Sequence, residues 1–193
     1  MLSYNGSLKI LKETNALLEG HFILSSGLHS KQYVQCAKLL SQPKKAGIIC
    51  FSLCEKIKRT FKKIDIILSP AIGGIVVGYE VGRQLALKTI FAERFDGNLI
   101  LRRGFKIPKN SNVLIVEDVI TTGKSALECS ELIEASKSKL VGYACIIDRS
   151  NSTSLIKNKI VSQIKLKIDT YKNKELPDDL KKIQPTKPGS RIL

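Results

Sequence analysis

Two adjacent carboxylates, Glu117 and Asp118, come directly after four apolar residues and just before a loop of small and hydroxyl-bearing residues. The whole segment reads Val113-Leu-Ile-Val-Glu-Asp-Val-Ile-Thr-Thr-Gly-Lys-Ser125. Ionised side chains at the end of a buried strand are costly unless they meet hydrogen-bond donors or a cation. Sugar hydroxyls are such donors, and the backbone N–H groups of a loop that starts a helix bind phosphate. The segment therefore predicts a site for a phosphorylated ribose.

Each half of this motif also has a simpler interpretation. An acidic pair before a helix stabilises the helix dipole, and taken alone the pair favours neither interpretation. The following loop, residues 121–125, favours the ligand site, because Lys124 is unfavourable at the start of a helix unless an anion lies nearby. The loop is not a Walker loop, since the spacing G-x-x-x-x-G-K-S/T is absent around Gly123.

The composition is that of one globular domain. The 193 residues are 43% hydrophobic and 25% charged, and this length suffices for a sizeable core. No segment approaches the roughly 18 consecutive apolar residues of a membrane span, and the N-terminus does not resemble a signal peptide. We therefore expect a cytoplasmic protein without a membrane partner. Five cysteines without a C-x-x-C pair argue against disulfides or zinc, and Cys50 and Cys54 are predicted to lie in the core.

The formal net charge of +15 allows three interpretations. A basic surface is typical of nucleic-acid-binding proteins, but the lysines are scattered and aromatic residues are only 6%, with none interleaved for base stacking. A lysine-rich, solvated surface is the simpler interpretation, and no nucleic-acid partner is expected. The third is a substrate with several negative charges, attracted into a positive cleft. Arginine is much rarer than lysine and occurs mostly in candidate site segments, where its planar fork suits bidentate contacts with anions.

Hydrophobic periodicity predicts helices that alternate with short, continuously apolar strands. Helices are expected at residues 7–18, 43–60, from the turn 69–74 to about 87, 124–136 and 177–183. Strands are expected at residues 64–68, 89–92, 113–117, 140–148 and 164–168, with a hairpin at 22–24 and 32–36. Residues 98–105 are either a short ribbon or a mobile loop. This alternation predicts an α/β fold with a parallel sheet covered on both faces. Ligands bind at the carboxyl ends of such strands, so the turns after residues 68, 92, 117 and 148 open onto one edge.

The segment 113–125 resembles the signature with which type I phosphoribosyltransferases bind 5-phosphoribosyl 1-diphosphate (PRPP). Purine-base members typically carry an acidic residue at the position of Thr121, whereas a hydroxyl suits a base that is already ionised. Further segments resemble the orotate-specific members of the family. These segments are residues 22–30 with Tyr33, 69–75, 91–94, 101–105, 148–149 and 187–191. The resemblance therefore covers nearly the whole chain in order.

This resemblance implies the type I phosphoribosyltransferase fold, with a central mostly parallel sheet, helices on both faces and a small N-terminal hood. It implies a single domain, residues 1–193, whose hood elements come from about residues 1–40 and the C-terminal segment. The implied reaction transfers the 5-phosphoribosyl group of PRPP to orotate, giving orotidine 5′-phosphate and diphosphate, with Mg²⁺ as cofactor and a homodimer as the assembly. Two alternatives stay open, a phosphoribosyltransferase for another base and a non-catalytic PRPP-sensing regulator. The regulator would need an added DNA-binding module, and no helix-turn-helix fits the residues before the site strand.

The resemblance assigns PRPP binding to a continuous set of residues. They are Glu117, Asp118, Val119, Ile120, Thr121, Thr122, Gly123, Lys124 and Ser125. The two carboxylates would hold the ribose hydroxyls, residues 121–125 the 5-phosphate, and Mg²⁺ would be held mainly by PRPP oxygens and water near Glu117 and Asp118. Thr121 and Arg149 would contact orotate, with Arg149 pairing with its carboxylate through a bidentate fork.

The remaining implied roles concern the diphosphate and the base. The turn of Ala71, Ile72 and Gly73 would line the diphosphate, and Arg94 lies in the stretch that faces it. Ser25, Ser26 and Tyr33 belong to the hood over the base. One departure concerns the better-known members, which carry a lysine at the position of Gly73 and lysines and a histidine on a mobile loop after Arg94. Here that loop is residues 95–104, and Arg102 or Arg103 is expected to supply the charge, across the dimer interface as in family members.

Overall fold

A six-stranded sheet forms the centre of the computed structural model, which describes residues 1–24, 26–150 and 154–188. In spatial order its strands are β5 (Asn98–Leu101), β4 (Lys88–Phe95), β3 (Ile66–Pro70), β6 (Asn112–Ile120), β7 (Lys139–Asp148) and β8 (Ile160–Lys165). All neighbours pair in parallel except β5, which runs antiparallel to β4 at one edge. Because β3, β4, β6, β7 and β8 run the same way, their carboxyl ends share one edge of the sheet.

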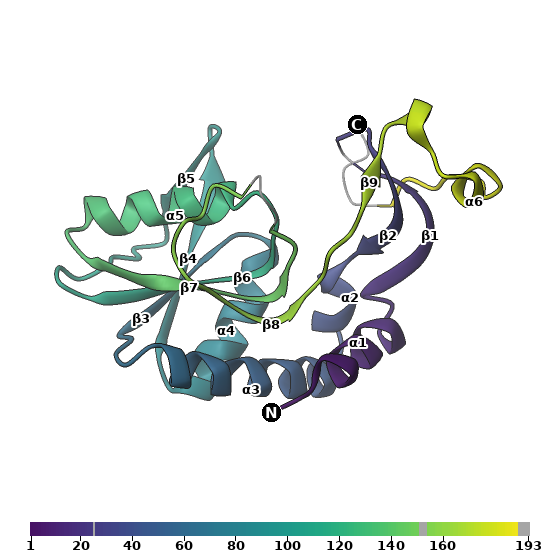
Figure 1. The fold of residues 1–193 in the computed structure, drawn as a ribbon. Coiled ribbons are helices and arrows are strands. Elements are labelled where there is room, and N and C mark those ends of the chain that lie inside the picture. The colour runs from purple at the N-terminus through teal and green to yellow at the C-terminus, as the bar shows by residue number, and fades with distance from the viewer. Residues whose placement is uncertain (25, 151–153, 189–193) are drawn as a thin grey trace.

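Three helices cover the two faces of this sheet. They are α3 (Pro43–Thr60), α4 (Gly73–Leu85) and α5 (Lys124–Ala135). Side chains alternate along a strand, so Leu114 and Val116 of β6 belong to the core under α3 and α4, while Val113 and Ile115 belong to the core under α5. Figure 1 shows α5 on one side of the sheet and α3 and α4 on the other. The predicted mostly parallel sheet with helices on both faces is confirmed.

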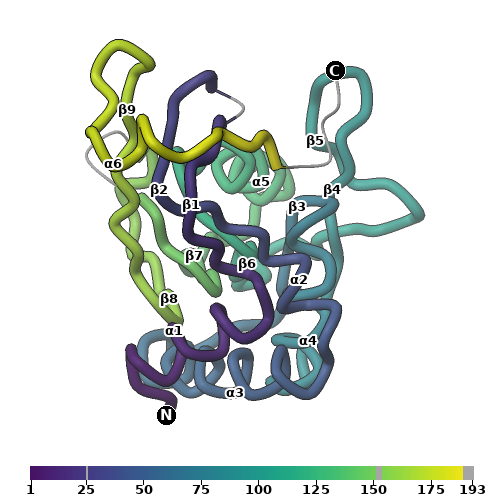
Figure 2. Tube along the Cα trace, turned by 90° about the vertical axis from the view of Figure 1, so that its right-hand side faces the viewer, coloured from purple at the N-terminus to yellow at the C-terminus, as the bar shows by residue number. Residues whose placement is uncertain are grey.

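The segments assigned to the hood form a second, smaller antiparallel sheet. Its strands, in the order β1-β2-β9, are β1 (Leu17–Ile23), β2 (His29–Val34) and β9 (Thr170–Tyr171). The short helices near it are α1 (Tyr4–Glu13), α2 (Cys36–Leu40), the 3-10 helix η1 (Asn173–Glu175) and α6 (Asp178–Lys181). Figure 2 shows the yellow C-terminal segment crossing the purple strands β1 and β2. Two main-chain hydrogen bonds of 2.8 Å, between Thr186 and both His21 and Ile23, fix this crossing.

The first predicted helix was wrong in its second half. Helix α1 ends at Glu13, and Leu17 and Leu18 belong to β1 instead. Asn15 has φ of 55°, which a right-handed helix does not continue. Leu17 then pairs with Val34 of the hairpin partner. Pairing with a distant strand therefore decides the conformation of two leucines whose spacing also fits a helix.

Smaller differences affect other boundaries. Ser69 and Pro70 lie in β3, paired with β4, although they were predicted to form a turn. Cys36 begins α2 rather than ending the hairpin strand. Residues 98–105 form a ribbon, because β5 pairs with β4 before a turn at Arg103. In the tail, the predicted strand 164–168 starts earlier, as β8, and the predicted helix 177–183 is reduced to the single turn α6.

The five cysteines are all buried and unpaired, which confirms Cys50 and Cys54 as core residues. Burial raises the pKa of both thiols to about 12. Throughout the described ranges, no helix combines the length and the apolar character that crossing a membrane requires.

Candidate functional site

Glu117 and Asp118 lie inside β6, which continues to Ile120, and not at the end of the strand as predicted. The alternation of side chains directs the two carboxylates to different faces of the sheet. Asp118 approaches the start of α4, where a Cβ atom added to Gly73 would lie 2.8 Å from its Oδ1 atom. Glu117 lies on the side of α5, where it raises the pKa of the Cys129 thiol in addition to burial.

Both carboxylates are half-buried, and their environment disfavours the ionised form. Burial, and then the neighbouring Asp118, raise the pKa of Glu117 to about 8. Burial also raises the pKa of Asp118, against hydrogen bonds from the backbone N–H groups of Val119 and Asp118. Within the described part of the chain, no Lys, Arg or His forms an ion pair with either one. Hydroxyl donors or a cation brought by a ligand would therefore be stabilising here.

The loop of residues 121–125 leads directly into α5. Gly123 has φ of 82°, a conformation that favours glycine, and a Cβ atom there would lie 2.6 Å from Ile156. Thr121, Thr122 and Lys124 are exposed, and helix α5 begins at Lys124. The first backbone N–H groups of this helix have no acceptor within the helix, so the loop offers the donors that an anion site at a helix N-terminus requires.

Two predicted PRPP-binding residues offer only their backbone. Val119 packs against the core under α3 and α4, and Ile120 is buried in the core under α5. The carbonyl oxygen of Ile120 accepts a 2.8 Å hydrogen bond from the Arg149 N–H group. The bond fixes the start of the turn after β7 beside the start of the loop of residues 121–125.

The turn of Ala71, Ile72 and Gly73 joins β3 to α4 at the same edge. Its Ala71 N–H group donates to Ala92 of β4 at 2.8 Å, and Ile72 is 86% exposed. The edge therefore carries a second helix N-terminus, that of α4, beside the one at α5. Because Asp118 lies so close to Gly73, a lysine at this position would require Asp118 to move.

Arg149 follows β7 and is half-buried. Its Nε atom is buried and has no hydrogen-bond partner among the described residues. Burial lowers the pKa of its guanidinium, and the nearby Tyr33 raises it. Asp148 does not orient it, because its Oδ1 atom accepts from the Ser150 N–H at 2.8 Å and its Oδ2 atom lies 3.7 Å from Lys165 Nζ. A cavity of about 1050 Å³ opens beside Arg149 and continues along residues 165–171.

Three arginines lie on the β4–β5 hairpin. Arg94 donates to Gly97 O and, at 2.6 Å, to Glu128 Oε2 of α5. Arg103 binds both carboxylate oxygens of Glu93, at 2.8 and 2.9 Å. Arg102 lies 5.1 Å from the centre of the Phe95 ring and, within the described ranges, has no carboxylate partner. Sequence reasoning did not identify Glu128, although its position four residues after Lys124 places it on the same side of α5.

The hood supplies the remaining predicted residues. Ser25 lies outside the described residues. Ser26 is exposed, and its hydroxyl accepts a 3.4 Å hydrogen bond from the Leu28 N–H. Tyr33 packs against Phe22 with ring centres 5.8 Å apart, and its hydroxyl donates to Gln35 at 3.2 Å. Tyr33 is therefore held in place near Arg149 by contacts within the hood.

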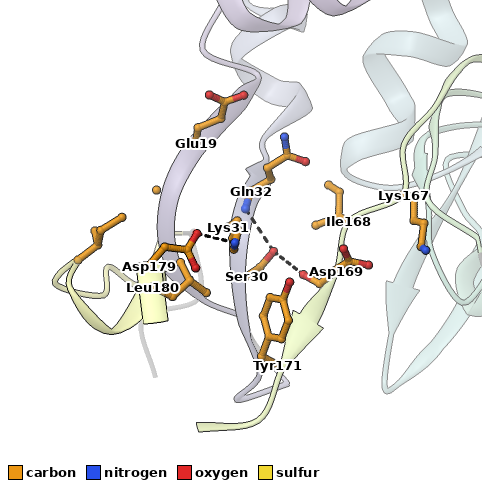
Figure 3. Close-up of a pocket in the computed structure, with 12 residues that line it drawn as sticks. Glu19, Ser30, Lys31, Gln32, Lys167, Ile168, Asp169, Tyr171, Asp179 and Leu180 are labelled. Atoms are coloured by element: carbon orange, nitrogen blue, oxygen red, sulfur yellow. Dashed lines mark hydrogen bonds and ion pairs between the residues drawn. The ribbon is translucent and has the colours of Figure 1, made fainter. Parts of the chain in front are cut away.

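A second cavity of about 390 Å³ lies between the hood strands and the C-terminal segment and shares Lys167, Ile168, Asp169 and Tyr171 with the cavity beside Arg149. Figure 3 shows Lys31 paired with Asp179 at 2.5 Å and the Ser30 hydroxyl donating to Asp169 O at 3.0 Å. None of the predicted site residues that the structure describes lines this cavity. The described site residues thus gather at the carboxyl edge of the central sheet and in the adjoining part of the hood.

Comparison with known proteins places this geometry in a family. The family model described as "Phosphoribosyl transferase domain" matches residues 38–180. The chain is 46% identical over 187 residues to an orotate phosphoribosyltransferase of Methylorubrum populi, with 96% of this chain and 95% of the relative covered. It is 45% identical over 184 residues to an orotate phosphoribosyltransferase of Caldicellulosiruptor bescii, with 95% and 96% covered.

Solved structures agree in fold at lower identity. The crystal structure of an orotate phosphoribosyltransferase from Aeropyrum pernix superposes with a TM-score of 0.69 at 23% identity, covering 82% of this chain and 93% of that one. An adenine phosphoribosyltransferase from Thermoanaerobacter pseudethanolicus gives 0.60 at 16% identity, covering 70% and 88%. At these identities the structures establish the fold alone.

Proposed function

The chain belongs to the phosphoribosyltransferases, and within them to the orotate phosphoribosyltransferases, and we propose that it transfers the phosphoribosyl group of PRPP to orotate at the carboxyl edge of the central sheet. One observation supports this site above all others. Two half-buried carboxylates lie near the carboxyl end of β6, and a half-buried guanidinium follows the adjacent strand β7. Among the described residues, the carboxylates have no ion-pair partner and the guanidinium Nε has no acceptor. The hydroxyl groups of a phosphorylated sugar would supply donors for the two carboxylates, and an anionic base would supply an acceptor for the guanidinium.

For PRPP, we propose that Glu117 and Asp118 hold the ribose hydroxyls and that residues 121–125 hold the 5-phosphate. The raised pKa of Glu117 supports the first role, because hydroxyl donors stabilise the ionised form. The exposed helix N-terminus after Gly123 supports the second. The turn of residues 71–73 and Arg94 would receive the diphosphate, since the start of α4 offers further N–H groups there.

We propose that Mg²⁺ is held mainly by PRPP oxygens and water beside Glu117 and Asp118. Within the described ranges, no group of three or more His, Cys, Asp and Glu side chains could hold a metal ion by itself. Two half-buried carboxylates with raised pKa values nevertheless fit a cation nearby. When bound, Mg²⁺ would offset the negative charge of the diphosphate. The chain contributes the two acidic side chains to this arrangement and not a complete ligand set.

For orotate, we propose that the Arg149 fork pairs with the carboxylate and that the Thr121 hydroxyl contacts the ring. Orotate carries its charge at neutral pH on the carboxylate, and its ring nitrogen must lose a proton as it bonds to C1 of the sugar. The leaving diphosphate is a base that can accept this proton, which agrees with a hydroxyl in place of an acid at Thr121. The barrier then lies in breaking the C1–O bond of the sugar as charge grows on the leaving diphosphate. A single preorganised donor at such a charge is worth about a hundredfold or more in rate.

The β4–β5 hairpin would complete the site by closing over the diphosphate. Closure keeps water from capturing the oxocarbenium-like sugar. Of its two loop arginines, Arg102 is better supported as the closing cation, because Arg103 would first have to leave both oxygens of Glu93. The hairpin of a partner subunit is proposed to supply this residue.

A turnover assay across bases tests the proposed reaction. With PRPP and Mg²⁺, orotate is expected to release diphosphate and form orotidine 5′-phosphate, whereas hypoxanthine, adenine and uracil are not. Turnover of another base in preference to orotate would support the first alternative. PRPP binding without turnover of any base would support the PRPP-sensing regulator.

We propose a homodimer formed through α3 and α4. Five large hydrophobic side chains of these helices and the turn before them are between 50% and 86% exposed: Ile48, Phe51, Ile72, Val76 and Tyr79. Because α3 and α4 pack side by side, these residues are available to a second copy on one side of the molecule. The patch adjoins the diphosphate turn at Ile72, so a second copy seated there would bring its own residues near the site.

Tyr79→Glu is expected to convert this dimer to a monomer, because it places a charge in the apolar patch. Light scattering after gel filtration is expected to give twice the chain mass of 21.4 kDa for the unaltered protein and 21.4 kDa for the variant. Tyr4→Glu is the matched control, since Tyr4 is a similarly exposed tyrosine on α1. A monomeric unaltered protein, or an unchanged mass in the Tyr79 variant, would contradict the interface.

The cytoplasmic location expected from the sequence stays a prediction.

A further inference from the structure

Glu128 on α5 occupies a position that the proposed chemistry does not use directly. Its Oε2 atom accepts a hydrogen bond of 2.6 Å from Nη2 of Arg94, and its side chain is only 21% exposed. The other end of the Arg94 fork, Nη1, donates to the carbonyl oxygen of Gly97 in the β4–β5 turn. The guanidinium is therefore held from two sides, by the helix and by the hairpin.

This double attachment differs from an ordinary surface ion pair. Surface pairs such as Arg83 with Glu80 join neighbours on one helix and contribute little. The Arg94–Glu128 pair instead joins the end of β4 to helix α5, which begins in the loop of residues 121–125; the two residues are 34 positions apart in the sequence. The contacts with Glu128 and Gly97 together use two of the five N–H donors of the Arg94 guanidinium, which leaves three for a ligand.

The pair also lies close to the acidic residues of the site. Burial raises the pKa of the Cys129 thiol, Glu117 and Glu128 raise it further, and Arg94 opposes them. One buried thiol is thus within electrostatic reach of Glu117, Glu128 and Arg94 together. Arg94 lies at the carboxyl end of β4, and its hydrogen bond with Glu128 holds its guanidinium against the first half of α5.

We infer that Glu128 is a positioning residue, which holds the Arg94 guanidinium in the orientation that receives the diphosphate of PRPP. This inference rests on the proposed function, because it takes the ligand of Arg94 from there. An unattached arginine side chain samples many rotamers, and a tether fixes the donors before the ligand arrives. The carboxylate itself does not touch the substrate.

A double-mutant cycle tests this role. Glu128→Ala is expected to lower kcat/KM for PRPP by roughly 10- to 100-fold, the usual cost of a misplaced contact group. Its KM for orotate is expected to stay unchanged. In an Arg94→Ala background the same change is expected to have less than about a twofold effect, because the group it positions is gone. An equal loss in both backgrounds would overturn the inference.

Two further variants separate positioning from general stabilisation. Glu128→Gln keeps an acceptor oxygen for Nη2 of Arg94, so most of the activity is expected to return. Glu131→Ala removes an exposed glutamate of the same helix and is expected to behave like the unaltered protein. Failure of the Gln variant to recover activity would count against an orienting hydrogen bond.

Binding of inorganic diphosphate, measured by calorimetry in the presence of Mg²⁺, gives a readout besides turnover. Glu128→Ala is expected to weaken it about tenfold, in parallel with kcat/KM for PRPP. If Arg94→Ala impairs PRPP use and Glu128→Ala does not, the positioning role alone is wrong. If Arg94→Ala leaves PRPP use and diphosphate binding unchanged, the proposed diphosphate contact is wrong and the inference fails with it.

Discussion

Arg149→Ala is expected to lower kcat/KM for orotate by about a thousandfold, while the Kd of PRPP changes less than about twofold. The half-buried guanidinium has a buried Nε without an acceptor in the described structure, so the orotate carboxylate would supply the missing contact. Steady-state kinetics with each substrate varied in turn, together with calorimetry for PRPP, measures both effects. Equal losses for the two substrates would contradict the role.

The stability of the same variant distinguishes a ligand contact from a structural one. Removing a half-buried guanidinium whose Nε has no partner among the described residues is expected to leave Tm unchanged or slightly higher. Arg149→Lys is the matched variant, because it keeps the charge and loses the planar fork. It is expected to recover only a small part of the activity. A clear fall in Tm for Arg149→Ala would indicate a structural role instead.

Glu117→Gln is expected to abolish most PRPP use and yet to stabilise the ligand-free protein at high pH. Burial raises the pKa of Glu117 from 4.5 in the unfolded chain to about 8 in the folded one. A raised pKa means that the folded state binds the proton more tightly. The contribution of Glu117 to the free energy of unfolding is therefore fully present below about pH 4.5, and it is lost as the pH rises through about 8. Glutamine mimics the protonated form at every pH and avoids this loss.

Thermal unfolding at two pH values measures the effect. At about pH 8.5 the free energy of unfolding of the variant is expected to be higher by about 2 kcal/mol. This is less than the full pKa shift of Glu117 would give, because the edge of the sheet is open to solvent and water screens the charge. At about pH 4.5 the two proteins are expected to unfold at nearly the same temperature. Glu131→Gln, on the exposed side of α5, is the control without a pH-dependent difference. A Tm difference that does not depend on pH would contradict the burial of this charge.

The central site motif could be predicted because its determinants are local. The apolar run 113–116, the two carboxylates and Gly123 fix a strand, a turn and a helix start within a few residues, and the structure has these in that order. The helix 43–60 was predicted to the residue, since Pro43 starts it and its apolar stripe is unbroken. The parallel sheet and its two-sided coverage then follow from the alternation of elements, whereas the strand order was not predicted.

The features that sequence reasoning missed depend on distant partners. Leu17 and Leu18 became a strand because Val34 and Tyr33 pair with them. The contact of Arg94 with Glu128 joins two elements whose side-chain orientations no local pattern specifies. The close approach of Asp118 to Gly73 likewise depends on how α4 packs on β6. The sequence therefore proposes residue types for the candidate site, but it does not specify how their side chains pair.

The sheet β1-β2-β9 has a consequence for synthesis of the chain. Its middle strand comes from residues 29–34 and one of its edges from residues 170–171, so the ribosome must translate residues 35–169 between the two strands before that edge exists. Strands β3, β4, β6 and β7 emerge earlier and can assemble around their own helices while translation continues. The edge beside His29 and Ser30 then forms after the central sheet, and a chain that stops before residue 170 would keep the strands of that sheet but lack this part of the hood.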